Sequence, residues 1–333
     1  MMPTTEKKTV LLTGAGGPAI PGMVAILRRW GFRIVAVDMD PRASGFYLAD
    51  AAYVVPSGVS PYFFSRLKDI CVSEEVDAVV SVVDEELVSV LDLESLGIAV
   101  IQPRRGFVEM CLDKYECMVR LKAAGINAPD TELMKDCKTP LAFPIFVKPR
   151  VGRGSRGCRV IGSSSEMDSF IVGSGYDPED LIVQRLLEGT EFTVSVIVWR
   201  DGEIQDIVPK QIISKVGVTR IAVTRRNERI ESLCRDIQKR FKADGPFNVQ
   251  LILDQNGIPW PFEINPRFST STTLTDAAGA DELGGLISQA FYGKSSYSFK
   301  SWRDGVVLIR YTADQFLDES EFQSKNIKFL RPK

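Results

Sequence analysis

Residues 259–268 (PWPFEINPRF) carry three polar side chains at every second position near the end of a mostly apolar segment. They are Glu263, Asn265 and Arg267, a carboxylate, a carboxamide and a guanidinium. Residues two apart in an extended strand lie on the same face of a sheet. The spacing therefore predicts a strand that presents these three groups together.

The preceding segment, residues 248–254 (NVQLILD), is also strand-like, and the Asn-Gly dipeptide at 256–257 separates the two. Asn-Gly is typical of a two-residue hairpin turn. We therefore expect an antiparallel hairpin with four polar side chains on one face, whereas a β-bulge would shift the register by one residue and divide this set between two faces. The predicted pairs are Gln250 with Glu263 and Asn248 with Asn265.

Two further features of the hairpin agree with this register. Pro259 and Pro261 fall at non-hydrogen-bonded pairs, where a missing N–H leaves no gap in the ladder. The opposite face is apolar and is expected to face a core. Its residues are Leu251, Leu253, Phe262 and Ile264.

The oxygen-bearing face is suited to a hard divalent cation, because Mg²⁺ takes one or two protein carboxylates together with phosphate oxygens. A solvated polar face is the alternative interpretation. The chain contains no histidine, which excludes Ser-His and Cys-His nucleophile pairs, His-ligated zinc and a histidine general base. An enzyme with this sequence would act through carboxylates, Lys, Arg and a metal cation.

Composition restricts the class of protein. The 333 residues are 44% hydrophobic, which predicts two or three packed units. The 41 basic and 43 acidic residues nearly balance, so we expect neither a nucleic-acid partner nor a membrane-facing basic helix. Apolar runs such as residues 76–83 are shorter than the ~18 to 20 residues of a membrane span, and the N-terminus lacks a signal-type apolar core. With six cysteines and no C-x-x-C pair, these features predict a cytoplasmic protein with reduced thiols.

The order of the predicted elements indicates the fold class. In the first hundred residues, strands alternate with helices, which predicts a parallel sheet covered by helices on both faces. The strands are expected at 9–13, 32–40, 76–83 and 98–102, and the helices at 23–31, 60–73 and 84–96. A mixed region follows, with helices at 113–124 and 164–172 and strands at 143–149, 158–162 and 181–187. From residue 191 onward the period is two, which predicts an antiparallel sheet.

These motifs together resemble the ATP-grasp superfamily, in particular the synthetase units of carbamoyl-phosphate synthase large subunits and small ligases related to them. The matching segments are DKY (113–115), FPIFVKP (143–149), VGRGSRG (151–157), QRLLEGTEFTVSV (184–196), NVQ (248–250) and EINPRFS (263–269). The resemblance implies a Rossmann-like pre-ATP-grasp domain followed by a two-subdomain ATP-grasp fold. The implied division is 1–103, 104–187, 188–300, and a C-terminal strand and tail at 301–333.

The resemblance also implies a role for individual residues. Lys114 and Lys148 would contact the ATP phosphates, and residues 151–157 would form a flap whose backbone N–H groups close over them, with Gly152, Gly154 and Ser155 among its contacts. Gln184, Arg185 and Leu186 would read the adenine, Glu191 would bind the ribose hydroxyls, and Asn248 would complete the nucleotide site. Gln250, Glu263 and Asn265 correspond to ligands of Mg²⁺, and Arg267 to the arginine that steadies the transferring phosphoryl group.

The implied reaction is phosphoryl transfer from ATP to a small-molecule carboxylate, which an amine then attacks to give an amide. Its cofactors would be ATP and two Mg²⁺ ions, which Mn²⁺ can replace, and the carboxylate would belong to an amino acid. Relatives hold the carboxylate near residues 209–220, so Lys210, Lys215 and Arg220 are candidates. Dimers are common among relatives, which leaves a homodimer open. A synthetase that releases carbamoyl phosphate or another free acyl phosphate is the alternative, and it would need a second synthetase unit at full length.

The N-terminal glycines support a rival hypothesis. Residues 14–19 fit G-x-G-x-x-A after a strand, and Asp38 ends the next strand, as in NAD-dependent dehydrogenases. Pro18 and Pro21 remove N–H donors that a pyrophosphate would use, which favours a tight strand-to-helix turn instead. Asp84, Glu85 and Glu86 could reach a substrate ammonium group or form the acidic first turn of a helix. A non-catalytic scaffold is disfavoured because the chemical groups of the ligase motif are all present.

Overall fold

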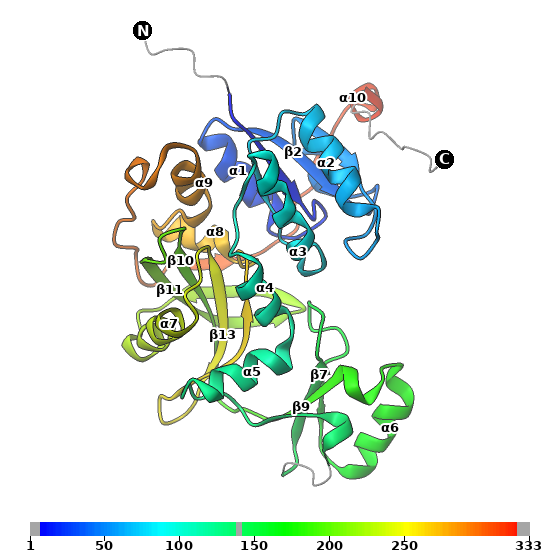
Figure 1. Ribbon diagram of the computed structural model, residues 1–333, viewed down its shortest axis with the longest axis vertical. Helices are drawn as coiled ribbons and strands as arrows, with labels where there is room; N and C mark the ends of the chain where they lie inside the picture. The colour runs from blue at the N-terminus through cyan, green and yellow to red at the C-terminus, as the bar shows by residue number, and fades with distance from the viewer. Residues whose placement is uncertain (1–6, 138–141, 325–333) are drawn as a thin grey trace. The chain divides into compact units, whose positions relative to one another are not determined.

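The computed structural model describes residues 7–137 and 142–324. It divides the chain into two compact units (Figure 1): unit 1 comprises residues 1–102 and 267–333, and unit 2 comprises residues 103–266. Residues 325–333 of the predicted tail and residues 1–6 of the predicted first domain lie outside the described residues.

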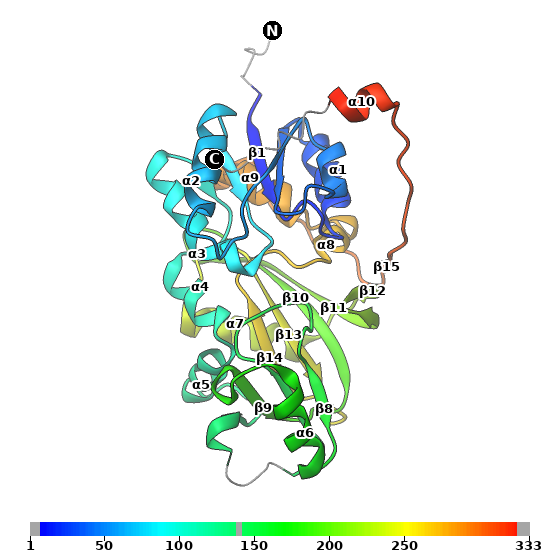
Figure 2. The ribbon, with the colours of Figure 1, turned by 90° about the vertical axis from the view of Figure 1, so that its right-hand side faces the viewer.

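Unit 1 contains the predicted parallel sheet. Its five strands run in the order β3-β2-β1-β4-β5, and all four pairs of neighbouring strands are parallel. The strands are β1 (Thr9–Thr13), β2 (Arg33–Asp38), β3 (Ala51–Val54), β4 (Ala78–Val80) and β5 (Ala99–Val100). The central strands read as continuous apolar runs because helices cover both faces. Figure 2 shows α1 (Ile20–Arg29) on one side of β1 and α2 (Phe63–Ser73) on the other.

The predicted helix at 84–96 is wrong as a single helix. The structure has the 3₁₀ turn η2 (Asp84–Glu86), one α-helical turn α3 (Leu87–Val90) and the 3₁₀ turn η3 (Leu91–Leu96). Leu87, Val90 and Leu93 are fully buried. This spacing of three matches the 3₁₀ period rather than 3.6 residues, because side chains three apart eclipse in a 3₁₀ helix.

The C-terminal part of the chain adds further elements to unit 1. The helix α1 contacts both α8 and α9, and the indole Nε1 of Trp30 in the turn after α1 donates to Asp281 (2.7 Å). The elements are α8 (Thr272–Ala278), α9 (Glu282–Tyr292), β15 (Val307–Ile309) and α10 (Glu319–Ser324). The strand β15 lies within residues 301–333, for which a C-terminal strand and tail were predicted.

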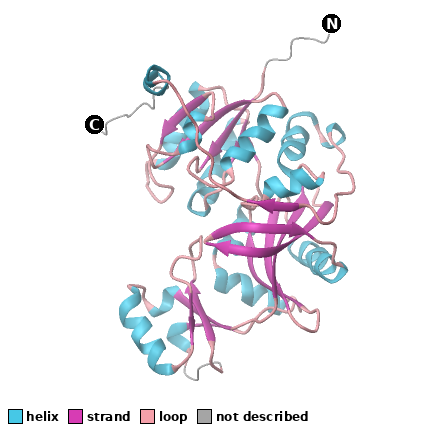
Figure 3. Ribbon diagram, turned by 180° about the vertical axis from the view of Figure 1, so that it is seen from behind, coloured by secondary structure: helices cyan, strands magenta, loops and turns pink. Residues whose placement is uncertain are grey.

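Unit 2 contains two antiparallel sheets, which Figure 3 shows as separate groups of strands. In the larger sheet the strands of this unit follow the order β14-β13-β10-β11-β12, as the period of two predicts. These strands are β10 (Thr190–Val198), β11 (Ile204–Val216), β12 (Val218–Thr224), β13 (Phe247–Leu253) and β14 (Pro259–Asn265). One face packs on α4 (Arg105–Leu112), α5 (Lys114–Ala123) and α7 (Glu228–Phe241), with a core that includes Met118, Val194, Ile237 and Val249.

The smaller sheet of unit 2 has the order β6-β9-β7-β8, with every neighbouring pair antiparallel. Its strands are β6 (Thr131–Leu133), β7 (Ile145–Pro149), β8 (Arg159–Ile161) and β9 (Leu181–Arg185), and α6 (Ser164–Ser174) packs on one face. The other face carries Lys148 and Gln184, which are polar and buried. A polar residue facing inward from a strand is costly unless it has partners, and these two residues lead to the candidate site.

Within the ranges that the structure describes, no helix has both the length and the apolar character needed to cross a bilayer.

Candidate functional site

The hairpin of β13 and β14 confirms the predicted pairs. Gln250 lies opposite Glu263, and Asn248 lies opposite Asn265. The predicted two-residue turn is wrong, however, because the amide of Asp254 donates to the carbonyl of Ile258 (3.0 Å) across a three-residue loop. Gly257 in that loop has φ of +71°, the left-handed conformation usual in three-residue hairpin loops.

A β-bulge restores the predicted register beyond the turn. Leu251 lies opposite Pro261, whereas Gln250 lies opposite Glu263, so Phe262 is the additional residue. The prediction that Phe262 faces the core with Leu251 and Ile264 is wrong, since Phe262 lines a pocket on the other side of the sheet. The bulge turns two consecutive residues of β14 toward that pocket.

The pocket lies in unit 2, between the two antiparallel sheets, and it contains about 890 Å³ of space not filled by protein atoms. This volume includes open solvent at the mouth of the pocket, and the cavity volume without it is about 220 Å³. Twelve of the residues predicted from the sequence line it. They are Lys114, Lys148, Gly152, Gly154, Ser155, Gln184, Arg185, Leu186, Glu191, Lys215, Gln250 and Glu263.

Lys148 projects from β7 into this pocket, and its side chain is 2% exposed. Its Nζ donates to the carbonyl of Phe262 (2.9 Å), so the bulge of β14 provides its partner. The pKa of Lys148 is lowered to about 8, mainly by burial; the negative charge of Glu263 opposes this shift and the positive charge of Lys114 adds to it. This buried ammonium group donates to a carbonyl rather than to a carboxylate, so it is suited to binding an anionic ligand.

Lys114 begins α5, where Asp113 caps the helix by accepting from the amides of Tyr115 and Glu116. The Nζ of Lys114 donates to the carbonyl of Gly152 (2.5 Å), which joins the helix to the first part of the flap. Asp113 also pairs with Arg150 (2.7 Å). Burial raises the pKa of Asp113, but the Arg150 and backbone hydrogen bonds outweigh it, so the pKa is lowered overall.

Gln184, Arg185 and Leu186 line the pocket at the end of β9. The Nε2 of Gln184 donates to Oγ1 of Thr131 (2.8 Å), and the guanidinium of Arg185 lies 4.8 Å from the Trp260 ring centroid. The side chains of both residues therefore have partners within the protein. The polar groups that this segment offers a ligand include its backbone N–H and C=O groups.

Glu191 at the start of β10 accepts from Nζ of Lys215 (2.6 Å). Lys215 is the only one of the three predicted substrate-binding residues that lines the pocket. Lys210 is fully buried and donates to Oγ of Ser195 (2.7 Å), and Arg220 is exposed. The structure therefore does not bring Lys210 and Arg220 into the pocket lining.

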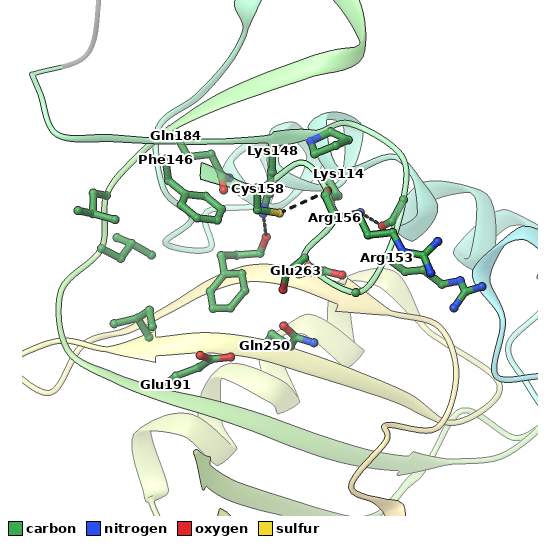
Figure 4. A pocket seen from close by; sticks show the side chains of 18 of the residues that line it. Lys114, Phe146, Lys148, Arg153, Arg156, Cys158, Gln184, Glu191, Gln250 and Glu263 are labelled. Carbon is green, nitrogen blue, oxygen red and sulfur yellow. Dashed lines mark hydrogen bonds between the residues drawn. The ribbon is translucent and has the colours of Figure 1, made fainter. Parts of the chain in front are cut away.

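Asn248 and Asn265 form a buried pair beyond the pocket lining, in which Nδ2 of Asn265 donates to Oδ1 of Asn248 (3.3 Å). The predicted four-residue face is continuous in register, but only Gln250 and Glu263 line the cavity. Figure 4 shows these two side chains on the floor of the pocket, with Lys148 and Gln184 on the opposite wall.

Arg267, Asp84 and Glu85 belong to unit 1. The guanidinium of Arg267 forms an ion pair with Asp84, and both side chains are about nine-tenths buried. Asp84, Glu85 and Glu86 form the acidic first turn η2, which is the alternative that the sequence left open. The carboxylate of Asp84 is thus bonded to an arginine, and Glu85 is exposed.

Asp38 stabilises the glycine-rich turn that follows β1. The carboxylate of Asp38 accepts from the amides of Gly16 and Asp40 (2.8 Å each). A Cβ on Gly14 would lie 2.7 Å from a methyl group of Val83, and Gly14 has φ of +66°. These contacts favour the tight strand-to-helix turn over a dinucleotide site, because the acid that would bind a ribose already caps the turn.

The donor set fits Mg²⁺ bound together with a polyphosphate. Among the residues that the structure describes, no three His, Cys, Asp or Glu side chains group as a metal site. Glu263 supplies one carboxylate and Gln250 one amide oxygen, and the two lie directly opposite each other. Mg²⁺ sites of this kind take the remaining oxygens from phosphate and water.

Several pocket residues were not predicted from the sequence. Phe146, Ile252 and Leu187 add apolar surface, and Cys158 lines the pocket beside the flap. Strand alternation could have predicted two of these pocket residues, because residues two apart share a face of the sheet. Phe146 lies two residues from Lys148, and Ile252 lies two residues from Gln250. These apolar side chains are suited to a flat ring such as a nucleobase.

The low pKa of Lys148 predicts a pH-dependent affinity for Mg·ADP. An anion favours the charged amine, which the free protein loses as pH rises through about 8. We expect the dissociation constant to be nearly constant from pH 6.5 to 7.5 and to rise by up to about tenfold per pH unit above pH 8. Calorimetric titration at fixed Mg²⁺ measures this. In Lys148→Arg the guanidinium stays charged, so the profile should become flat; an equal rise in both proteins would assign the effect to another group.

Comparison with known proteins finds two matching families. Residues 111–271 match the family described as the ATP-grasp domain, and residues 10–98 match the PylC-like N-terminal domain. The chain is 25% identical over 318 residues to the carbamoyl phosphate synthase large chain of Xylella fastidiosa, with 82% of this chain aligned. It spans only 29% of that relative's length.

Solved structures share the fold. The biotin carboxylase domain of Hydrogenobacter thermophilus 2-oxoglutarate carboxylase, crystallised as a dimer with MgADP, ADP and bicarbonate, superposes with a TM-score of 0.71 at 18% identity, covering 90% of this chain and 73% of that one. The L-amino acid ligase of Bacillus licheniformis superposes with a TM-score of 0.68 at 16% identity, covering 88% and 77%. The fold class predicted from the sequence is confirmed, and the chain belongs to the ATP-grasp superfamily, with a PylC-like N-terminal domain.

Proposed function

We propose that this protein is an ATP- and Mg²⁺-dependent ligase that joins a small-molecule carboxylate, from an amino acid, to an amine and releases ADP and phosphate. The observation that carries the proposal is the pocket of unit 2. It brings two lysines, a glycine-rich flap and the Gln250–Glu263 pair into one cavity. Among the similar solved structures, an L-amino acid ligase has the same fold.

In this proposal the nucleotide spans the pocket. The adenine lies on the backbone of residues 184–186 between Phe146 and Ile252, and Glu191 binds the ribose hydroxyls after releasing Lys215. The triphosphate extends toward Lys148, Lys114 and the amides of the flap. Gln250 and Glu263 hold Mg²⁺, with Asn265 as a further ligand after it separates from Asn248. The metal supplies positive charge that offsets the charge on the phosphate oxygens.

The protein's part in the reaction is positioning and charge neutralisation. A substrate carboxylate oxygen attacks the γ-phosphorus, the bond to ADP breaks, and an acyl phosphate forms. The amine nitrogen then attacks the acyl carbon, the C–O bond to phosphate breaks, and the amine loses a proton. Lys148 neutralises the transferring group. Arg267, which the sequence indicated for this role, pairs with Asp84 within unit 1. No step requires a histidine, which the chain lacks.

The candidates from the sequence for the substrate side are Lys210, Lys215, Arg220, Asp84 and Glu85, of which Lys215 lines the pocket. Lys215 donates to Glu191, the residue proposed for the ribose, so it lies at the nucleoside end of the pocket rather than beside the γ-phosphate. A homodimer in the cytoplasm, without nucleic-acid or membrane partners, completes the proposal.

A ligand panel tests the nucleotide assignment. Mg·ADP at about 100 times its dissociation constant should stabilise the fold by roughly 2.7 kcal/mol, which raises the melting temperature by several degrees, and omitting Mg²⁺ should reduce this shift. NAD should have no effect. Stabilisation by NAD with indifference to Mg·ADP would support the dehydrogenase hypothesis instead.

A product assay tests the reaction. Pairs of amino acids and amines, screened for phosphate release, should yield ADP; AMP and pyrophosphate would show adenylate chemistry. A bicarbonate-dependent release of phosphate without an amino acid would support the carbamoyl phosphate alternative, which the 25% identity to the Xylella fastidiosa large chain favours.

A further inference from the structure

The lining of the pocket of unit 2 is predominantly basic. Its described lining contains six basic side chains and two carboxylates. Lys215 is paired with Glu191, and Arg185 lies over Trp260. The other charged residues of the lining are Lys114, Lys148, Arg153, Arg156 and Glu263.

The two arginines of this group are part of the flap, residues 151–157. Figure 4 shows Arg153 and Arg156 beyond Lys114, at the end of the pocket farthest from Gln184. If the adenine lies at Gln184 and the phosphates at Lys148 and Lys114, the arginines lie past the γ-phosphate, where an acceptor would enter. The two lysines and the magnesium ions already neutralise the triphosphate in the proposed function.

The backbone of the flap forms a tight turn. Gly154 and Ser155 both have left-handed conformations, with φ of +69° and +57°. Lys114 donates to the carbonyl of Gly152, and Gly157 lies close to Pro149 and Tyr176. The turn between these contacts carries Arg153 and Arg156, and both line the pocket.

We infer that Arg153 and Arg156 bind a second anionic group of the acceptor, so that the substrate is an amino acid with a carboxylate or phosphate in its side chain. A guanidinium group forms paired hydrogen bonds with either anion. The inference rests on the proposed function, since it uses the same pocket and direction of the nucleotide. It extends that function by selecting a substrate class.

Matched ligands test this inference in the full chain saturated with Mg·ADP. Two pairs differ in the side-chain charge: L-glutamate against L-glutamine, and O-phospho-L-serine against L-serine. At constant ionic strength, the anionic member of at least one pair should bind about tenfold tighter or better. The double variant Arg153→Gln/Arg156→Gln should reduce this preference to within about threefold, while the dissociation constant of Mg·ADP changes by less than about threefold.

The matched control is Arg159→Gln. Arg159 follows the flap, pairs with Glu166 (3.5 Å) and is absent from the pocket lining, so the preference should persist. Equal affinity within both pairs, including no measurable binding of the anionic members, would overturn the inference. So would a loss of Mg·ADP affinity in the double variant with an unchanged preference, which would assign the arginines to the nucleotide. Failure of the wild type to bind Mg·ADP would refute the proposed function instead.

Discussion

Glu263→Gln is expected to reduce ATP turnover by about 10³-fold and to remove the dependence of ADP affinity on Mg²⁺. Glu263 is the only carboxylate that joins Gln250 in the described pocket lining apart from Glu191, which bonds Lys215. Glutamine keeps the shape of the side chain but removes the charge that holds the cation. Loss of a group that stabilises transition-state charge typically costs two to three orders of magnitude, or about 3 to 4 kcal/mol.

Two measurements make this result specific to the metal. ADP affinity with and without Mg²⁺ should differ in the wild type and coincide in Glu263→Gln, and the melting temperature of the free protein should change little. Glu203→Gln, an exposed residue before β11, is the control and should behave as the wild type. Near-normal turnover in Glu263→Gln, or a retained Mg²⁺ effect, would remove Glu263 from the metal site.

Lys148→Met is expected to abolish turnover while making the free protein more stable at pH 7. Burial holds the pKa of Lys148 near 8, against 10.5 for an ordinary lysine, which corresponds to a folding cost of about 3 kcal/mol when the amine is charged. Methionine removes that cost. It also removes the bond to the carbonyl of Phe262, which offsets about 1 to 3 kcal/mol. We expect a net gain of about 1 kcal/mol, and a loss of ADP affinity of about 30-fold or more.

The pH dependence of unfolding separates the charge from the packing. For a lysine with a lowered pKa, the cost of burial is complete below about pH 8 and decreases as pH rises toward 10.5, because the unfolded chain holds the proton longer. The stability gain of Lys148→Met should therefore shrink between pH 8 and pH 10. Lys135→Met, at an exposed lysine of the same unit, is the control and should show no such trend. A variant that is less stable than the wild type at pH 7 and equally so at pH 10 would contradict this explanation.

The Lys148 variant indicates a conflict between stability and function in the pocket. A buried amine is unfavourable for folding, yet it is placed where an anionic ligand would relieve the cost.

The sequence alone determined the elements with strong periodicity. Continuous apolar runs predicted the parallel strands β1, β2 and β4, because helices on both faces leave no room for alternation. Alternating residues predicted β10, β13 and β14. The opposition of Gln250 and Glu263 was predicted through a two-residue turn that the structure does not have, and the bulge at Phe262 restores it. The strands themselves depend on local patterns of residue type, which can be recognised without the tertiary structure.

Short elements with weak patterns could not be predicted. The edge strand β3 is half-buried along its whole length, so it has no alternation. Residues 84–96 have enough apolar side chains for an α-helix, and only the packing of Leu87, Val90 and Leu93 at intervals of three selects 3₁₀ turns. The propensity or period of one segment carries no information about the surface against which that segment packs.

The lysines and the glycine-rich flap were thus predicted from residue type and spacing. Tertiary structure decided which of the predicted residues share a cavity. The bulge at Phe262 restored the opposition of Gln250 and Glu263 and brought a ring and a carbonyl to Lys148. Asn248 and Asn265 bond each other outside the pocket lining, and Arg267 pairs with Asp84. Each outcome depends on contacts between residues that are far apart in the sequence, and no local sequence pattern encodes such contacts.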